Sequence, residues 1–125
     1  MWGLRLFKCF ESVGVFDVAD RAALVNDDKT VNLDPEGLAQ ASDGGFWLVS
    51  EGSGTIGDDS RPINSLNMLI KLSAEAVIEQ VITLPGSVNA TQQRFGFEGV
   101  AEQGGKVYVA FQRAWQGDTE PRIGV

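Results

Sequence analysis

Hydrophobic and polar residues alternate in short runs along the chain, with the two-residue period that is typical of β-strands. Met68, Ile70 and Leu72, for example, fall on one face of an extended segment. Gly- and Pro-rich stretches separate the runs and are typical of turns. The pattern predicts four consecutive strands, at residues 37–41, 46–51, 67–72 and 77–84, with a long loop at 52–65.

The last of these segments has two interpretations. Val77, Ile78, Val81 and Ile82 also recur at the spacing of a helix face, and Ser73 is a residue type that caps helices. Against the helix, the segment is rich in β-branched residues and stops at a Pro-Gly pair. The strand is therefore the favoured interpretation.

A repeat relates two parts of the chain. Glu98-Gly99-Val100-Ala101 matches Glu36-Gly37-Leu38-Ala39, 62 positions earlier (98 against 36). In each copy a Gly-rich turn follows, and then a strand that contains aromatic residues, at 46–51 in the first copy and 107–112 in the second. The same order of tetrapeptide, turn and strand indicates a repeated structural unit.

Four short antiparallel strands in each repeat are the unit of a β-propeller, whose blades pack one against the next. We therefore expect an all-β chain that forms a partial β-propeller of about two four-stranded blades. Residues 1–33 would supply outer strands of a preceding blade, residues 34–85 one blade, and residues 94–125 the start of the next.

A complete propeller has about four to eight blades. At 62 residues for each blade, a chain of 125 residues holds about two. The chain is therefore expected to be a fragment of a larger ring. The remaining blades would come from a longer polypeptide or from self-association, because open sheet edges otherwise invite aggregation.

Composition narrows the chemistry. The net charge of −7 disfavours a nucleic-acid partner, which requires clustered Lys and Arg. The chain has no histidine, and Cys9 is its one cysteine, which removes His-dependent catalysis and cysteine metal clusters. Residues 1–10 are too short for a signal peptide, and no stretch has the length of a membrane span. Carboxylates, amides, hydroxyls, Lys and Arg remain to do any chemistry.

Glu36 and Glu98 are the sharpest candidates. Each would stand at the start of a blade's innermost strand, so that both carboxylates approach the central channel. Converging carboxylates repel unless they are hydrated, protonated or bound to a cation, and calcium prefers oxygen ligands. The alternative is structural: the Glu accepts backbone hydrogen bonds, and the Gly after it supplies an unusual backbone angle. Both interpretations remain open at this point.

Three segments together resemble a known family. They read "DPEGLAQASDGGFWLVSEGS", "NMLIKLSAEAVIEQVITLP" and "RFGFEGVAEQGGKVYVAFQ", and they span residues 34–112. The arrangement is similar to that of the phytase-like family, whose description is "esterase-like activity of phytase". The resemblance implies a β-propeller that hydrolyses a small phosphate or carboxylic ester, in a periplasmic or secreted location.

The resemblance also implies roles for particular residues, with no catalytic residue assigned. Asp34, Glu36 and Glu98 match the acids of its Glu-Gly motifs and would bind a divalent metal, calcium above all. Such a cation would polarise the ester and activate water, since there is no histidine base. Glu51 matches the Ser-Glu end of a strand, where the second copy has Gln112. Substrate contacts would come from Glu51, Arg61, Arg94 and Arg113.

A second group of propellers, of the SdiA-regulated type, has a similar Glu-Gly pattern. That resemblance implies a non-catalytic module that binds a ligand or a protein partner. The sequence therefore leaves two functions open, an ester hydrolase and a binding module.

Overall fold

A computed structural model of the protein describes residues 5–7, 11–13, 28, 33–115 and 117–125. These residues form strands almost throughout, and the four-residue α2 (Gly86–Asn89) is the helix among them. The strands are β1 (Arg5–Phe7), β2 (Glu11–Val13), β3 (Pro35–Gln40), β4 (Phe46–Ser50), β5 (Met68–Leu72), β6 (Ile78–Thr83), β7 (Phe97–Gln103), β8 (Lys106–Phe111) and β9 (Arg122–Gly124). The predicted all-β class is confirmed.

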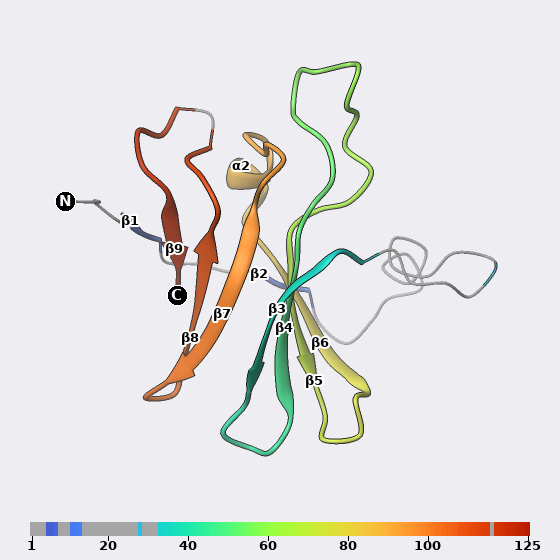
Figure 1. Ribbon diagram of the computed structural model, residues 1–125, viewed down its shortest axis with the longest axis vertical. Coiled ribbons are helices and arrows are strands. Elements are labelled where there is room, and N and C mark those ends of the chain that lie inside the picture. Colours follow the sequence, from blue (N-terminus) through green and yellow to red (C-terminus); the bar gives the residue numbers. More distant parts are fainter. Residues whose placement is uncertain (1–4, 8–10, 14–27, 29–32, 116) are drawn as a thin grey trace.

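The strands make two sheets. One has five strands in the order β2-β6-β5-β4-β3, and the other has four in the order β1-β9-β8-β7. All neighbours are antiparallel except β1 and β9. Figure 1 shows the hairpin turns of both sheets at one end of the molecule and the long connections at the other. Neither sheet closes on itself among the described strands.

All four strands expected between residues 37 and 84 are present, with bounds moved by one or two residues. The disputed segment is strand β6, so the helical interpretation of 77–84 is wrong. Val81 of β6 lies opposite Ile70 of β5, and Ile82 lies opposite Leu69. Pairing with a buried neighbouring strand decided between two patterns that the local sequence allowed.

The N-terminal strands extend the two sheets. β1 pairs in parallel with β9, and β2 pairs with β6 and forms an edge of its sheet. The rest of residues 1–33 lies almost wholly outside the described part of the chain. The division into a preceding blade at 1–33, a blade at 34–85 and the start of another at 94–125 therefore remains a prediction.

The main core lies between the two sheets. Its buried members are Val49, Leu69, Leu84, Val88, Phe97, Val109, Phe111 and Trp115. The ring of Phe111 meets Phe97 edge-on at 5.1 Å and Trp115 edge-on at 4.9 Å. Edge-to-face aromatic pairs of this kind add to the stabilisation gained from burial. The α2 residue Val88 belongs to the same core, which explains why this short helix lies against the sheets.

A second apolar cluster occupies the opposite face of the five-stranded sheet. Met68, Ile70 and Val81 are its buried members, and Leu33, Leu48, Leu72 and Ile78 pack around them. The register explains the grouping, because Leu48, Ile70 and Val81 stand opposite one another on three adjacent strands. The central strands of this sheet are thus apolar on both faces.

Each Glu-Gly pair sits at a β-bulge. The register of β3 against β4 shifts between Pro35 and Gly37, and that of β7 against β8 shifts between Phe97 and Gly99. Glu36 and Glu98 are the extra residues in these two irregularities. Bulges bend a strand and redirect a side chain, and they occur often next to functional sites.

The glycines after these acids permit a close approach of the two sheets. A methyl group on Gly37 would lie 3.0 Å from Gly99 Cα, 3.0 Å from a Val49 methyl and 3.2 Å from the Glu98 carbonyl oxygen. Gly37 and Gly99 both have negative φ, because neither is among the positive-φ glycines of the described residues. A positive φ is therefore not the reason for these glycines, and the close approach of the sheets accounts for glycine at position 37.

Polar contacts join the sheets at the hairpin end. Trp47 Nε1 donates a hydrogen bond of 2.6 Å to Glu102, and the Ser42 backbone N–H donates one of 3.2 Å to the same carboxylate. Lys71, which is buried, donates to Asp43 at 2.9 Å and lies 5.6 Å from the centre of the Trp47 ring. Glu102 of one sheet thus holds a strand and a turn of the other.

Replacing Gly37 with alanine is expected to lower the free energy of unfolding by about 1–3 kcal/mol, because the added methyl group meets backbone atoms that cannot move aside. Gly99→Ala is the matched control, since its methyl group would lie 4.0 Å from Ala110 Cβ, at an ordinary contact distance. The control should change stability by less than about 0.5 kcal/mol. Urea unfolding of both variants measures the difference, and equal losses would contradict the close approach.

Candidate functional site

Three carboxylates meet at the end of the molecule where the long connections lie. Asp34, Glu36 and Glu51 each offer an oxygen, and these oxygens lie within 4.8 Å of one another. Asp34 directly precedes β3, Glu36 occupies the bulge of that strand, and Glu51 directly follows β4. Pairing of the two strands brings together acids that are 15 to 17 residues apart in the sequence.

Hydrogen bonds fix two of these acids. The Glu51 N–H donates to the Asp34 carbonyl oxygen at 2.8 Å. The Asp34 N–H donates to the hydroxyl of Ser50 at 3.0 Å, and Ser50 is fully buried. The Glu51 carboxylate accepts from the Gly96 N–H at 2.9 Å. Glu51 is therefore tied both to its own sheet and to the segment that leads into β7.

The second copy of the repeat has the same backbone arrangement but lacks two of the three acids. Gln112 N–H donates to the Gly96 carbonyl oxygen at 2.8 Å, which is the counterpart of the bond from Glu51 to Asp34. In this copy Gly96 and Gln112 stand where the first copy has Asp34 and Glu51. The acidic cluster is thus a property of the first copy.

The pKa of the Glu36 carboxyl is raised above its ordinary value of 4.5. Loss of solvation is the largest cause, and the negative charges of Asp34, Glu98 and Glu51 follow in that order. Glu98 therefore influences Glu36 through its charge, although it is not one of the three grouped acids. Like charges in one place favour either a proton or a bound cation.

The donors of the cluster have the chemistry of a hard-cation site. All three are carboxylate oxygens, with no nitrogen or sulfur among them. Oxygen donors alone are the ligands that calcium and other hard divalent cations prefer. Asp34, Glu36 and Glu51 are therefore the residues of the described chain that could hold such an ion.

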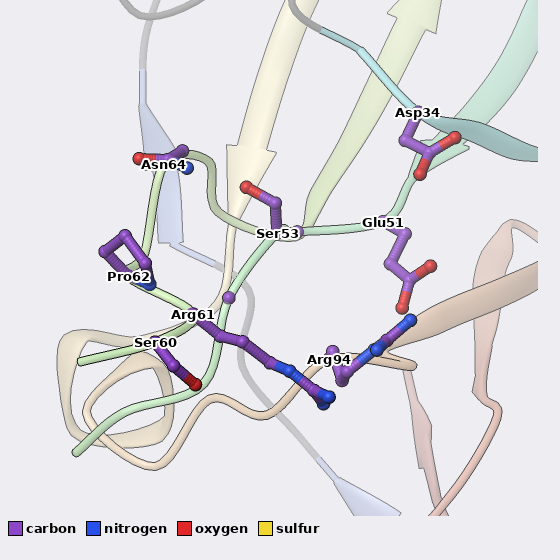
Figure 2. A pocket seen from close by; sticks show the side chains of 10 residues that line it. Asp34, Glu51, Ser53, Ser60, Arg61, Pro62, Asn64 and Arg94 are labelled. Atoms are coloured by element: carbon purple, nitrogen blue, oxygen red, sulfur yellow. The ribbon is translucent and has the colours of Figure 1, made fainter. Parts of the chain in front are cut away.

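A pocket of about 390 Å³ adjoins the acids. Its wall is the loop between β4 and β5 together with Asp34, Glu51 and Arg94. Figure 2 shows the side chains of Arg61 and Arg94 extending toward the side of the pocket on which Glu51 lies. One wall is thus acidic, and another carries two guanidinium groups.

Neither arginine forms an ion pair with a described carboxylate. Among the residues that the structure describes, the ion pairs involve Lys71 and Arg122, and no acid lies within 4.0 Å of Arg61 or Arg94. The pKa of the Asp58 carboxyl is nevertheless lowered, first by a side-chain hydrogen bond and also by the charge of Arg61. Two guanidinium groups that line one pocket outside direct ion pairs present several N–H donors to it. An arrangement of this kind is suited to binding an oxyanion.

Two buried amides hold the pocket loop, and the sequence did not single them out. Asn67 Oδ1 accepts from the N–H groups of Gly52 and Phe97 at 3.1 and 2.9 Å. Gln92 Nε2 donates to the carbonyl oxygens of Ser53 and Ser65 at 3.3 and 3.0 Å. A methyl group on Gly96 would collide with Asn67, so the position directly before β7 requires glycine. Only the three-dimensional contacts distinguish these amides from ordinary loop residues.

The residues predicted from the sequence divide into two groups. Asp34, Glu36, Glu51, Arg61 and Arg94 all lie at the cluster or the pocket. Two others lie outside both sets: Glu98 is exposed on the bulge of β7, and Arg113 is exposed and donates to Gln93 Oε1 at 3.3 Å. The metal and substrate roles of all seven remain predictions.

The protein is therefore an all-β repeat protein with an acidic cluster beside an arginine-lined pocket. The sequence model of the family described as phytase-like, with esterase-like activity of phytase, matches residues 7–124. The chain belongs to the phytase-like family, and the resemblance noted in its motifs is confirmed. No curated protein and no solved structure matched the chain. The described part of the chain contains no helix with the length and hydrophobicity of a membrane span.

Glu36→Gln is expected to stabilise the metal-free protein at neutral pH. Because the pKa of Glu36 is raised in the folded state, its ionisation costs stability as the pH rises above 4.5 and through that raised pKa. Glutamine removes this cost, so the wild type and the variant should differ most near pH 7 and converge near pH 4. Urea unfolding between pH 4 and pH 7 in calcium-free buffer measures this difference in the free energy of unfolding. A variant that is less stable than the wild type at pH 7 would contradict an unfavourable ionisation of Glu36.

Proposed function

We propose that this chain is part of a β-propeller hydrolase that cleaves a phosphate or carboxylic ester with the help of a divalent cation. The observation that carries the proposal is the grouping of Asp34, Glu36 and Glu51 beside a pocket that Arg61 and Arg94 line. Membership of the phytase-like family supports the same reaction class.

The chain's own residues divide the work between a cation site and an anion site. Asp34, Glu36 and Glu51 would hold the cation, which supplies polarisation of the ester and activation of water when it is bound. Arg61 and Arg94 would bind the negative oxygens of the substrate and orient it against the acids. The buried amides Asn67 and Gln92 keep the loop between these groups in place. This division is consistent with a chain that contains no histidine.

The packing of the repeats supports the propeller. The face of the four-stranded sheet that carries Val107 and Val109 packs on the face of the other sheet that carries Val49 and Leu69. Residues 46 and 48 are the counterparts of 107 and 109 in the first copy, and they lie on its opposite face with Ile70. That face is therefore the one expected to receive a preceding blade. Such a blade would come from a longer polypeptide or from a second copy of the chain.

Leu38 offers a test of blade docking, since it lies on β3 with a side chain that is 62% exposed. Its counterpart Val100 packs against the main core. If a second copy supplies the preceding blade, Leu38→Asp should shift the chain toward a monomer in sedimentation velocity, by tenfold or more in dissociation constant. Val77→Asp is the matched control, because Val77 is 61% exposed in the turn between β5 and β6. Equal behaviour of the two variants would contradict docking on this face.

Calcium titration tests the cation site. Isothermal titration of the chain with calcium should show binding that Glu36→Gln or Glu51→Gln weakens at least tenfold, since even residues behind the ligands contribute that much. Glu98→Gln is the comparison, because Glu98 lies outside the grouped acids and acts on Glu36 through its charge, so a smaller loss than that of Glu51→Gln is expected. Glu36→Gln and Glu51→Gln should also lower the calcium-dependent hydrolysis of p-nitrophenyl phosphate or p-nitrophenyl acetate. Glu98→Gln should lower it less. Calcium binding that depends on Glu98 but not on Glu51 would overturn the assignment.

A non-catalytic binding module is the second candidate. One observation favours it: the hydroxyls of the two serines that line the pocket are engaged in local hydrogen bonds. The Ser60 hydroxyl donates to Asp58 at 2.5 Å, and the Ser53 hydroxyl accepts from the Ser65 hydroxyl at 3.1 Å. Calcium and anion binding without turnover of either ester would establish this alternative.

A further inference from the structure

Phe95 has a backbone conformation that is unfavourable for its side chain. Its φ is 68°, in the left-handed region where glycine is normally found. Ala76, with φ of 61°, is the other non-glycine residue in this region among those described. A bulky residue persists in this conformation only where its surroundings impose it, and such residues gather at functional sites.

The neighbours of Phe95 are fixed on both sides. The Arg94 N–H donates to the Thr55 hydroxyl at 3.3 Å, and the Gly96 N–H donates to the Glu51 carboxylate at 2.9 Å. The segment is thus anchored to the pocket loop before Phe95 and to the acidic cluster after it. These anchors explain why the backbone cannot relax at this residue.

The ring of Phe95 contacts two arginines. The Arg94 guanidinium lies 4.2 Å from the ring centre, and the Arg113 guanidinium lies 5.0 Å from it. Phe95 belongs to neither hydrophobic cluster of the described residues. Its side chain therefore does little for the core, and glycine would satisfy the backbone at lower cost. The ring needs an explanation other than packing of the fold.

Stacking on an aromatic ring has a specific effect on an arginine. It restricts the guanidinium while leaving the in-plane N–H groups free, whereas an ion pair would occupy them. Arg94 lines the pocket and has no acid within 4.0 Å among the described residues. It is therefore held in place and remains free to donate.

We propose that Phe95 is a positioning residue, which holds Arg94 ready to bind an oxyanion such as a phosphate or carboxylate group in the pocket. Arg113 contributes a second positive charge on the same ring without reaching the pocket. This inference rests on the proposed function, because it assumes that the pocket binds an anionic group. It adds that the strained backbone serves ligand binding and not the stability of the fold.

Two glycine variants separate these roles. Phe95→Gly relieves the strain and removes the ring, and Ala76→Gly relieves the same strain in the turn between β5 and β6, away from the pocket. Ala76→Gly should keep or raise the thermal midpoint and leave the affinity for inorganic phosphate unchanged. Phe95→Gly should remain folded and bind phosphate about two- to fivefold more weakly, the size of an exposed cation–π contact.

Thermal unfolding gives the midpoints, and an NMR titration of the 125-residue chain with inorganic phosphate gives the affinity and the position of the Arg94 resonance. Ring currents from Phe95 should displace the Arg94 Nε–H resonance in the wild type, and Phe95→Gly should return it to its ordinary position without ligand. Phe95→Leu, which keeps the side-chain bulk but not the ring, should act in the same way and serves if the glycine variant unfolds.

The outcomes distinguish the two levels of the proposal. If Arg94→Ala weakens phosphate binding while Phe95→Gly and Phe95→Leu do not, the positioning role is wrong and the anion pocket stands. If neither Arg61→Ala nor Arg94→Ala lowers phosphate affinity, the anion pocket fails and the role of Phe95 fails with it. An Arg94 resonance that the Phe95 variants leave unmoved overturns the stacking directly.

Discussion

The approach of two backbones at Gly37 and Gly99 is the constraint on which the rest of the structure depends. Where the two β-bulges meet, no side chain separates β3 from β7. The sheets can then share one core, and the loops of the first sheet reach the strand entrance of the second. The bond from Gly96 to Glu51 exists only because the sheets lie this close. A single absent methyl group thus sets the geometry of both the core and the site.

The two copies of the repeat share a backbone plan but carry different chemistry. The first copy supplies the three grouped carboxylates and the pocket loop with Arg61. In the second copy, Glu98 is the one acid that has a counterpart among these three carboxylates. The segment that leads into the second copy supplies Arg94 and Phe95. The two copies thus have equivalent positions, and two of the acids of the first are replaced by Gly96 and Gln112 in the second. The pocket is lined by residues of the first copy and by Arg94 from the segment before the second.

Much of the fold follows from patterns of short range. Alternation and turn residues located β3 to β8, and the Glu-Gly repeat identified the acids at the strand starts. The sequence paired Glu36 with Glu98 because their motifs match, whereas the structure groups Glu36 with Glu51. A bulge decides where a side chain points, and hydrophobic patterns do not record it. The roles of Asn67 and Gln92, and the φ of Phe95, depend on contacts between distant segments, which local propensity cannot reveal.

The two outer faces of this pair of sheets are not alike. The five-stranded sheet presents Leu38 and Leu48 on the face away from the core, and the four-stranded sheet presents Ala101 and Ala110, which are exposed. A junction between unlike faces would be head-to-tail, and an open series of such junctions would leave one face of each kind free. The angle through which one unit turned against the next would then determine whether the series closed into a ring or continued as a spiral.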